Sequence, residues 1–311
     1  MRVLVTGGTR GIGREIVEAI VARGKEHVVY LGCRDIGGGW ELEDMIKGGR
    51  YDAAGNIQTE RRDGVIALEL DVTDRESIAA AAAKVASSGL LLDAVVCNAG
   101  VMLERDADKH DCFWHRATGD EFHGEIGCDL AATIEPTFRV NVDGVISVTE
   151  AFISQIADGG QIINVSSGAG TRATGALDES VRAELQAADA PSLRAIAARL
   201  AHSASTKAHA PRGDTPIYGL SKAAVNYYTR LVARDNPRLR VNACSPGFCR
   251  TEIAGLDVVY TREPKAARLG ADVVVKLLFG ELGHETGTFY KECSKPGTRV
   301  DQARSAVEPW Y

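Results

Sequence analysis

The chain has 311 residues, of which 45% are apolar and 25% are charged, proportions that are ordinary for a globular protein. Its formal net charge of -6 argues against a nucleic-acid partner, which requires a basic surface, and no apolar run reaches the roughly 18 residues of a spanning helix. The first apolar run begins at Val3 and leaves no room for a signal peptide, and the seven cysteines form no CxxC pair. We therefore expect a cytoplasmic protein with reduced thiols and no membrane or nucleic-acid partner.

Short, mostly β-branched apolar runs alternate with longer amphipathic segments along the whole chain. The runs predict buried parallel strands over residues 3–5, 28–32, 65–70, 94–97, 162–165, 239–243 and 287–290. Helical spacing of apolar residues predicts helices over residues 13–23, 75–87, 135–157 and 218–234. This alternation predicts an α/β fold with a doubly wound parallel sheet, the Rossmann fold, as a single domain over residues 1–311.

Three segments are predicted to be insertions in that domain. Residues 37–63 are rich in glycine and charge and fit a loop with one helix, residues 103–130 are polar, and residues 172–215 contain an apolar periodic stretch that predicts helices. The middle segment carries five side chains of metal-ligand type, His110, Cys112, His115, His123 and Cys128. Their spacings match no zinc module, so we expect a polar loop and no metal.

A glycine-rich turn follows the first predicted strand and opens the first predicted helix. Its residues are Thr6-Gly7-Gly8-Thr9-Arg10-Gly11-Ile12-Gly13. Glycines there let the backbone turn tightly and approach a pyrophosphate, whose charge meets the helix N-terminus. A simple turn would use the same residues, but the position between strand and helix favours a dinucleotide site.

The end of the second predicted strand indicates which dinucleotide is bound. An NAD enzyme is expected to carry an acid there, whereas this chain has Cys33 followed by Arg34. A guanidinium pairs with a 2′-phosphate, and Arg10 supplies a second cation, so the sequence favours NADP. Two alternatives stay open: Asp35 could turn toward the ribose, and Arg34 could be a solvated surface charge.

Tyr218 and Lys222 are four residues apart on a predicted helix, so they share one face. A nearby ammonium lowers the pKa of a phenol, which can then exchange a proton with a substrate oxygen. A structural tyrosine beside a lysine is the alternative, but the pair lies between a serine-ending strand and a Pro-Gly turn. Tyr227 and Tyr228, on the same helix, lack a lysine four residues on and are predicted to pack in the core.

The turn Thr-Gly-x-x-x-Gly-x-Gly and the Tyr-x-x-x-Lys pair together resemble the short-chain dehydrogenase/reductase family. The resemblance covers nearly the whole chain except residues 37–63 and 103–130. It implies further cofactor-binding residues after the third and fourth strands: Asp71, Val72, Asn98, Ala99 and Gly100. Cys97 stands where the family usually has a second asparagine, a departure that leaves the backbone role intact.

The resemblance also completes a catalytic set around the Tyr218–Lys222 pair. It implies that Ser167 binds the substrate oxygen, with Ser166 as the alternative if the register slips, and that Asn141 holds a water in a proton relay to the lysine. After the sixth strand it places Pro246, Gly247 and Thr251 against the nicotinamide, and Phe248 and Gly168 along the substrate pocket.

The motif over residues 242–252 and the insertion 172–215 resemble the carbonyl-reductase branch of the family. That branch reduces ketones, aldehydes and quinones with NADPH, and its members are often monomeric. We therefore expect a monomeric carbonyl reductase with a small-molecule carbonyl substrate, a dimer being the alternative. Two other functions stay open: a catalytically idle NADP(H)-binding sensor or partner protein, and an NAD-linked alcohol dehydrogenase of the same fold.

Overall fold

The computed structural model describes residues 1–47, 64–103, 130–205, 216–254, 263–282 and 284–291. Its centre is a seven-stranded sheet in the order β3-β2-β1-β4-β5-β6-β7, in which every pairing is parallel. The strands are β1 Arg2–Thr6, β2 Val28–Cys33, β3 Val65–Glu69, β4 Leu92–Cys97, β5 Ile156–Val165, β6 Arg240–Ser245 and β7 Phe289–Lys291. All seven predicted strands are present, and the doubly wound parallel sheet is confirmed.

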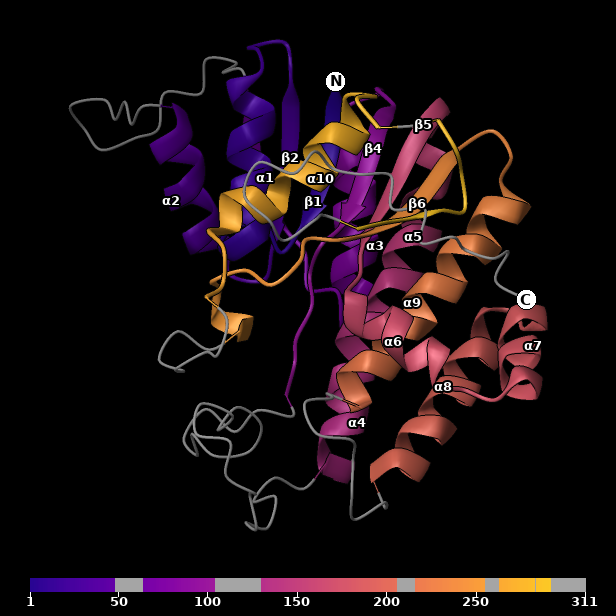
Figure 1. Ribbon diagram of the computed structural model, residues 1–311. Coiled ribbons are helices and arrows are strands. Elements are labelled where there is room, and N and C mark those ends of the chain that lie inside the picture. Colours follow the sequence, from indigo (N-terminus) through magenta and orange to yellow (C-terminus); the bar gives the residue numbers. More distant parts are fainter. Residues whose placement is uncertain (48–63, 104–129, 206–215, 255–262, 283, 292–311) are drawn as a thin grey trace.

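Helices cover both faces of this sheet (Figure 1). One face carries α1 Gly11–Ala22, α2 Ile36–Lys47 and α10 Ala267–Leu278, and the other carries α3 Arg75–Ala86, α5 Gly144–Phe152 and α9 Pro216–Asp235. The strand order reverses between β1 and β4, so the crevice at their carboxyl ends is where a ligand is expected in such a sheet.

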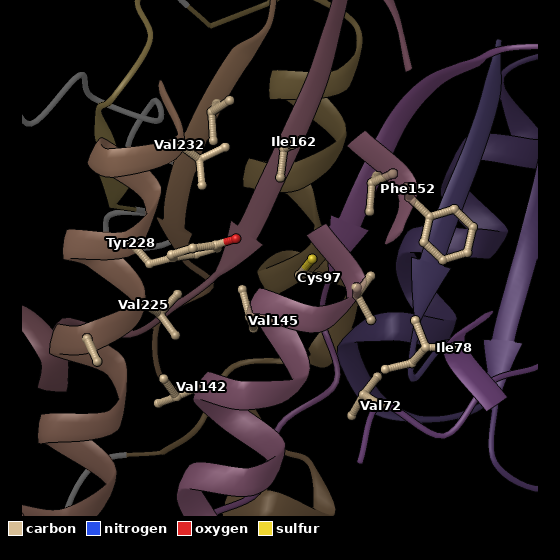
Figure 2. Close-up of a cluster of buried hydrophobic side chains, with 14 of the residues drawn as sticks. Val72, Ile78, Cys97, Val142, Val145, Phe152, Ile162, Val225, Tyr228 and Val232 are labelled. Carbon is tan, nitrogen blue, oxygen red and sulfur yellow. The ribbon is translucent and has the colours of Figure 1, made fainter. Parts of the chain in front are cut away.

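Two apolar layers, one on each face, hold these elements together. The larger one packs α3, α5 and α9 against the sheet, as Figure 2 shows for Phe152 of α5, Tyr228 of α9 and Ile162 of β5. Tyr227 and Tyr228 are both buried, in agreement with their predicted packing role. Cys33, Cys97, Cys244 and Cys249 are buried and in the reduced form.

The helix predicted over residues 135–157 is the main difference from the sequence-based expectation. The chain forms α4 Leu130–Phe138, a π turn at Arg139–Asp143 and then α5, and the 3₁₀ turn Ile153–Gln155 leads directly into β5. Pro136 lacks an amide hydrogen and removes one helical hydrogen bond just before the π turn. The prediction was therefore wrong from about residue 153 onward, where Ile156 already pairs with Leu92 as a strand residue.

Two of the three predicted insertions contain helices in the described part. The first contains α2, and the third contains α7 Glu179–Ala187 and α8 Ala190–Ser205, which lie against α9 (Figure 1). Residues 104–129, with the five side chains of metal-ligand type, lie outside the described residues, as do 48–63 and 206–215. Among the helices that the structure describes, none is long and apolar enough to cross a membrane.

Candidate active site

The glycine-rich turn joins β1 to α1 at the reversal of strand order. Gly7 and Gly11 have φ angles of +64° and +53°, which side-chain-bearing residues rarely adopt. A Cβ on Gly13 would lie 2.2 Å from the Gly7 carbonyl oxygen. The first turn of α1 contains no acidic residue, and Arg10 at its N-cap forms no side-chain capping bond. This close-fitting backbone at a helix N-terminus suits the pyrophosphate of a dinucleotide.

Replacing Gly13 by alanine is therefore expected to disrupt this turn. The added Cβ would meet the Gly7 carbonyl oxygen and the Asn98 amide nitrogen, the latter at 2.5 Å, so we expect about 1–3 kcal/mol of destabilisation and weaker dinucleotide binding. Gly175→Ala is the matched control, because its added Cβ would meet nothing within 4 Å beyond its chain neighbours and its own helix backbone. Urea unfolding and fluorescence titration with NADPH measure both effects; equal behaviour of the two variants would contradict the expectation.

The Asn98-Ala99-Gly100 segment is tied to this turn by hydrogen bonds. The Asn98 side-chain amide donates to the carbonyl oxygens of Thr6 and Gly7 at 2.9 and 3.1 Å, and the Thr6 hydroxyl accepts from the amides of Asn98 and Ala99 at 3.0 Å each. The side chain of Asn98 therefore supports the turn.

The charged residues at the end of β2 differ in their surroundings. Arg34 and Asp35 are both exposed, but Asp35 accepts a hydrogen bond of 3.0 Å from the Gly37 amide at the start of α2.

Asp71, after β3, accepts two bonds of 2.8 Å from the amide and hydroxyl of Thr73. Arg10 forms an ion pair with Glu252, a partner that the sequence did not indicate.

Tyr218 and Lys222 lie on successive turns of α9. The Lys222 ammonium is 5.7 Å from the centre of the Tyr218 ring and donates a hydrogen bond of 2.8 Å to the Val165 carbonyl at the end of β5. Only 4% of Lys222 is exposed, and this burial lowers the pKa of its ammonium to about 8. A cation held there can stabilise a neighbouring phenolate.

Asn141 is fully buried within the π turn. Its amide forms two bonds with the backbone of Val101: its oxygen accepts from the Val101 amide at 2.8 Å, and its nitrogen donates to the Val101 carbonyl at 2.9 Å. The same nitrogen donates to the Ser221 hydroxyl at 3.0 Å, which in turn donates to the Tyr218 carbonyl at 2.8 Å. A Cβ built on Gly100 would lie 3.3 Å from the Asn141 oxygen and 3.4 Å from the Lys222 nitrogen. Both polar atoms therefore lie close to the backbone of Gly100.

The two serines at the end of β5 have different environments. Ser166 is buried, and its hydroxyl donates to the Lys222 carbonyl at 3.2 Å. Ser167 is half-buried at the N-cap of α6 Gly168–Gly175, where its hydroxyl accepts from the Ala169 amide at 3.1 Å. Ser167 is therefore the more accessible of the pair.

The segment that follows β6 contacts both the residues after Ser167 at the end of β5 and the glycine-rich turn. The Ser245 hydroxyl accepts from the amides of Gly168 and Gly247 at 3.1 and 3.3 Å, and Gly247 has a φ of +80°. A Cβ on Gly11 would lie 3.4 Å from the methyl group of Thr251, which is buried. Pro246 precedes Gly247 in this segment, and Phe248 follows half-buried. No cluster of three or more candidate metal ligands occurs in the described part of the chain.

Comparison with known proteins gives consistent results. The short chain dehydrogenase family model matches residues 1–177, more than half of the chain. Salutaridine reductase from Papaver somniferum is 29% identical over 94% of both chains, and (+)-neomenthol dehydrogenase from Arabidopsis thaliana is 29% identical over 80% of this chain and 83% of its own. The solved structure of the Papaver somniferum reductase, 24% identical, matches with a TM-score of 0.70 over 93% of this chain and 99% of that one.

The residues matched by the family model include the glycine-rich turn and the Ser166–Ser167 pair. The similarity to the relatives extends beyond residue 177. The structural match independently reproduces the parallel sheet with helices on both faces. Members of this family are oxidoreductases that bind a nicotinamide cofactor. The chain belongs to the short-chain dehydrogenase/reductase family and is an oxidoreductase.

Proposed function

We propose that the protein is an NADP(H)-dependent reductase of ketones, aldehydes or quinones, with Tyr218 as general acid. The observation that carries this proposal is the buried Lys222 ammonium, 5.7 Å from the Tyr218 ring at the carboxyl end of the sheet. The relatives named as reductase and dehydrogenase support the same reaction class. The insertion helices α7 and α8 pack on α9, which supports the carbonyl-reductase branch and a monomer.

The reaction follows from what each side chain can do. When bound, a reduced nicotinamide supplies the hydride for the carbonyl carbon. Ser167 donates a hydrogen bond to the carbonyl oxygen as negative charge develops there, and Tyr218 transfers its phenolic proton to that oxygen. Lys222 stabilises the resulting phenolate through its charge. Asn141 belongs to the route by which Tyr218 regains a proton.

The other predicted site residues would contact the cofactor or the substrate. Gly7, Thr9, Gly11, Ile12 and Gly13 would hold the pyrophosphate. Adenine would lie against Asp71 and Val72, and the ribose and nicotinamide against Asn98, Ala99, Gly100, Pro246, Gly247 and Thr251. Gly168 and Phe248 would face the carbonyl substrate.

The preference for NADP depends on the cations near the end of β2. Asp35 accepts a hydrogen bond from the Gly37 amide at the start of α2, and this contact supports a role for its carboxylate in the helix start. Arg10 has the Glu252 carboxylate as a partner, so Arg34 is the leading candidate for the 2′-phosphate.

Kinetics with both nucleotides test the function and the preference together. We expect NADPH oxidation with a panel of ketones, aldehydes and quinones, and we expect Arg34→Ala to lower kcat/KM for NADPH by about ten- to a hundred-fold, because a charged hydrogen bond is lost. The variant is expected to change kcat/KM for NADH by less than about two-fold, since NADH lacks the 2′-phosphate.

Arg234→Ala is the control, because Arg234 is an exposed arginine at the far end of α9 whose guanidinium pairs with Asp235. Binding of NADPH without turnover of any carbonyl would overturn the reductase proposal in favour of an idle sensor. A wild-type enzyme that prefers NADH would favour an NAD-linked alcohol dehydrogenase.

A further inference from the structure

Arg194 of α8 links the third insertion to the segment that carries Asn141. Its guanidinium donates to both carboxylate oxygens of Glu135 at 2.9 Å and to the two oxygens of Asp143 at 3.1 and 3.2 Å. It also lies 5.8 Å from the centre of the Phe138 ring. Only 26% of the Arg194 side chain is exposed, and its hydrogen bonds with Asp143 raise its pKa further. The cation therefore stays charged and is held at this place.

The two carboxylates lie near the two ends of the π turn, one before it and one at its last position. Glu135 belongs to α4, which precedes the turn, and Asp143 is its last residue. In an uninterrupted α-helix, residues eight apart are offset by about 80° around the axis, because successive residues rotate by about 100°. The π turn, closed by the hydrogen bond from the Gly144 amide to the Arg139 carbonyl, takes up roughly one extra residue of rotation.

This extra residue brings Glu135 and Asp143 back to nearly the same face of the helix. One planar guanidinium can then bind both of them, which it could do less well across a regular α-helix. The Arg194 bridge therefore favours the π turn over the straight helical alternative.

The π turn in turn determines where Asn141 lies. In this register its amide reaches the backbone of Val101 and the hydroxyl of Ser221, the residue next to Lys222. A shift to straight helix would rotate Asn141 by about 100° and break these three bonds. A contact from the insertion to this helix is thereby linked to the position of Asn141.

We propose that Arg194 is a positioning residue: by bridging Glu135 and Asp143 it holds the π turn that presents Asn141 to the active site. The catalytic part of this inference rests on the proposed function, whereas the structural part does not. It gives the insertion α7–α8 a role in turnover besides covering α9.

Arg194→Met and Arg199→Met form a matched pair for the test. Both arginines lie on α8 and pair with carboxylates, but Arg199 pairs with Glu184 inside the insertion. Amide hydrogen exchange followed by mass spectrometry is the first readout. We expect exchange in the peptide covering residues 139–144 to become about three- to ten-fold faster in Arg194→Met and to stay unchanged in Arg199→Met.

Steady-state kinetics with NADPH and the best carbonyl substrate are the second readout. Arg194→Met is expected to lower kcat about three- to ten-fold, with KM for NADPH within about two-fold of wild type. In an Asn141→Ala background the same substitution is expected to lower kcat no further, because its effect passes through Asn141. Arg194→Lys is expected to restore only part of the activity, since an ammonium does not bind two carboxylates in a fork.

Each outcome bears on a distinct claim. Unchanged exchange over residues 139–144 in Arg194→Met overturns the inference whether or not the enzyme turns over. A full additional loss of kcat in the Asn141→Ala background also overturns it, because Arg194 would then act by another route. Absence of turnover in the wild-type protein overturns the proposed function and leaves the exchange result to decide the structural part.

Discussion

Replacing Tyr218 by phenylalanine is expected to lower kcat for carbonyl reduction by about a thousand-fold, within the range measured for loss of a general acid. The substitution removes only the hydroxyl group that we propose as the proton donor, while the ring beside the Lys222 ammonium remains. We therefore expect dissociation constants for NADPH within about three-fold of wild type, since the ring still occupies its place. Single-turnover kinetics and fluorescence titration measure the two quantities.

Tyr227→Phe is the matched control on the same helix. Tyr227 is buried in the apolar layer between α9 and its neighbours, and burial raises the pKa of its phenol, so it is a poor proton donor. We expect this variant to keep at least about half of the wild-type kcat. If Tyr218→Phe retained more than about a tenth of the activity, another group would have to supply the proton.

The sheet could be predicted from the sequence because each strand is a short apolar run. β1, β4 and β6 lie in the middle of the sheet with a helical layer on either face, so nearly all of their residues are buried and alternation is absent. Such runs stand out from the amphipathic helices around them.

The helices were less fully predictable. The apolar phase of α5 continues into Ile156, but that residue is buried by pairing in β5 and not by a helix. Helix α10 went unpredicted, because its second half, Val273–Leu278, is a nearly continuous apolar stretch that periodicity cannot distinguish from a strand. In the first case a strand residue continues the apolar spacing of the helix, and in the second the apolar residues are too continuous to show a helical period.

The candidate site was predictable wherever a motif is local. The glycine-rich turn, the Tyr218–Lys222 pair and the Ser166–Ser167 pair each depend on residues within a few positions of one another, and the structure gathers them at the carboxyl ends of the strands. Partners far apart in the sequence had no such signal. Arg10 with Glu252 and Arg194 with Glu135 are separated by 242 and 59 residues, so only the fold reveals them.

Lys222→Met is expected to lower kcat and to change how the free energy of unfolding depends on pH. Removing the ammonium leaves Tyr218 without a neighbouring charge to stabilise its phenolate, so we expect kcat to fall by about a hundred- to a thousand-fold. The folded protein, in contrast, loses a charge that it keeps almost wholly buried. Its free energy of unfolding should therefore change with pH differently from that of the wild type.

The sign of this change follows from the lowered pKa of Lys222, about 8 in the folded chain against 10.5 ordinarily. Below pH 8 both states carry the proton, and the full cost of burying the charge is present. Between pH 8 and 10.5 the unfolded chain binds a proton that the folded chain has released, so the free energy of unfolding rises with pH. Groups shared by both proteins cancel in the comparison of wild type with Lys222→Met.

We therefore expect the wild type to gain about 3 kcal/mol relative to Lys222→Met as the pH rises from 7 to 11, since each pKa unit corresponds to about 1.4 kcal/mol. Urea unfolding at several pH values measures it, with Lys84→Met, which removes an exposed ammonium of α3, as the control. A stability difference that stayed constant over this range would mean that Lys222 titrates alike in both states. Such a result would contradict our interpretation that the folded chain buries the Lys222 charge beside Tyr218 at a cost in stability.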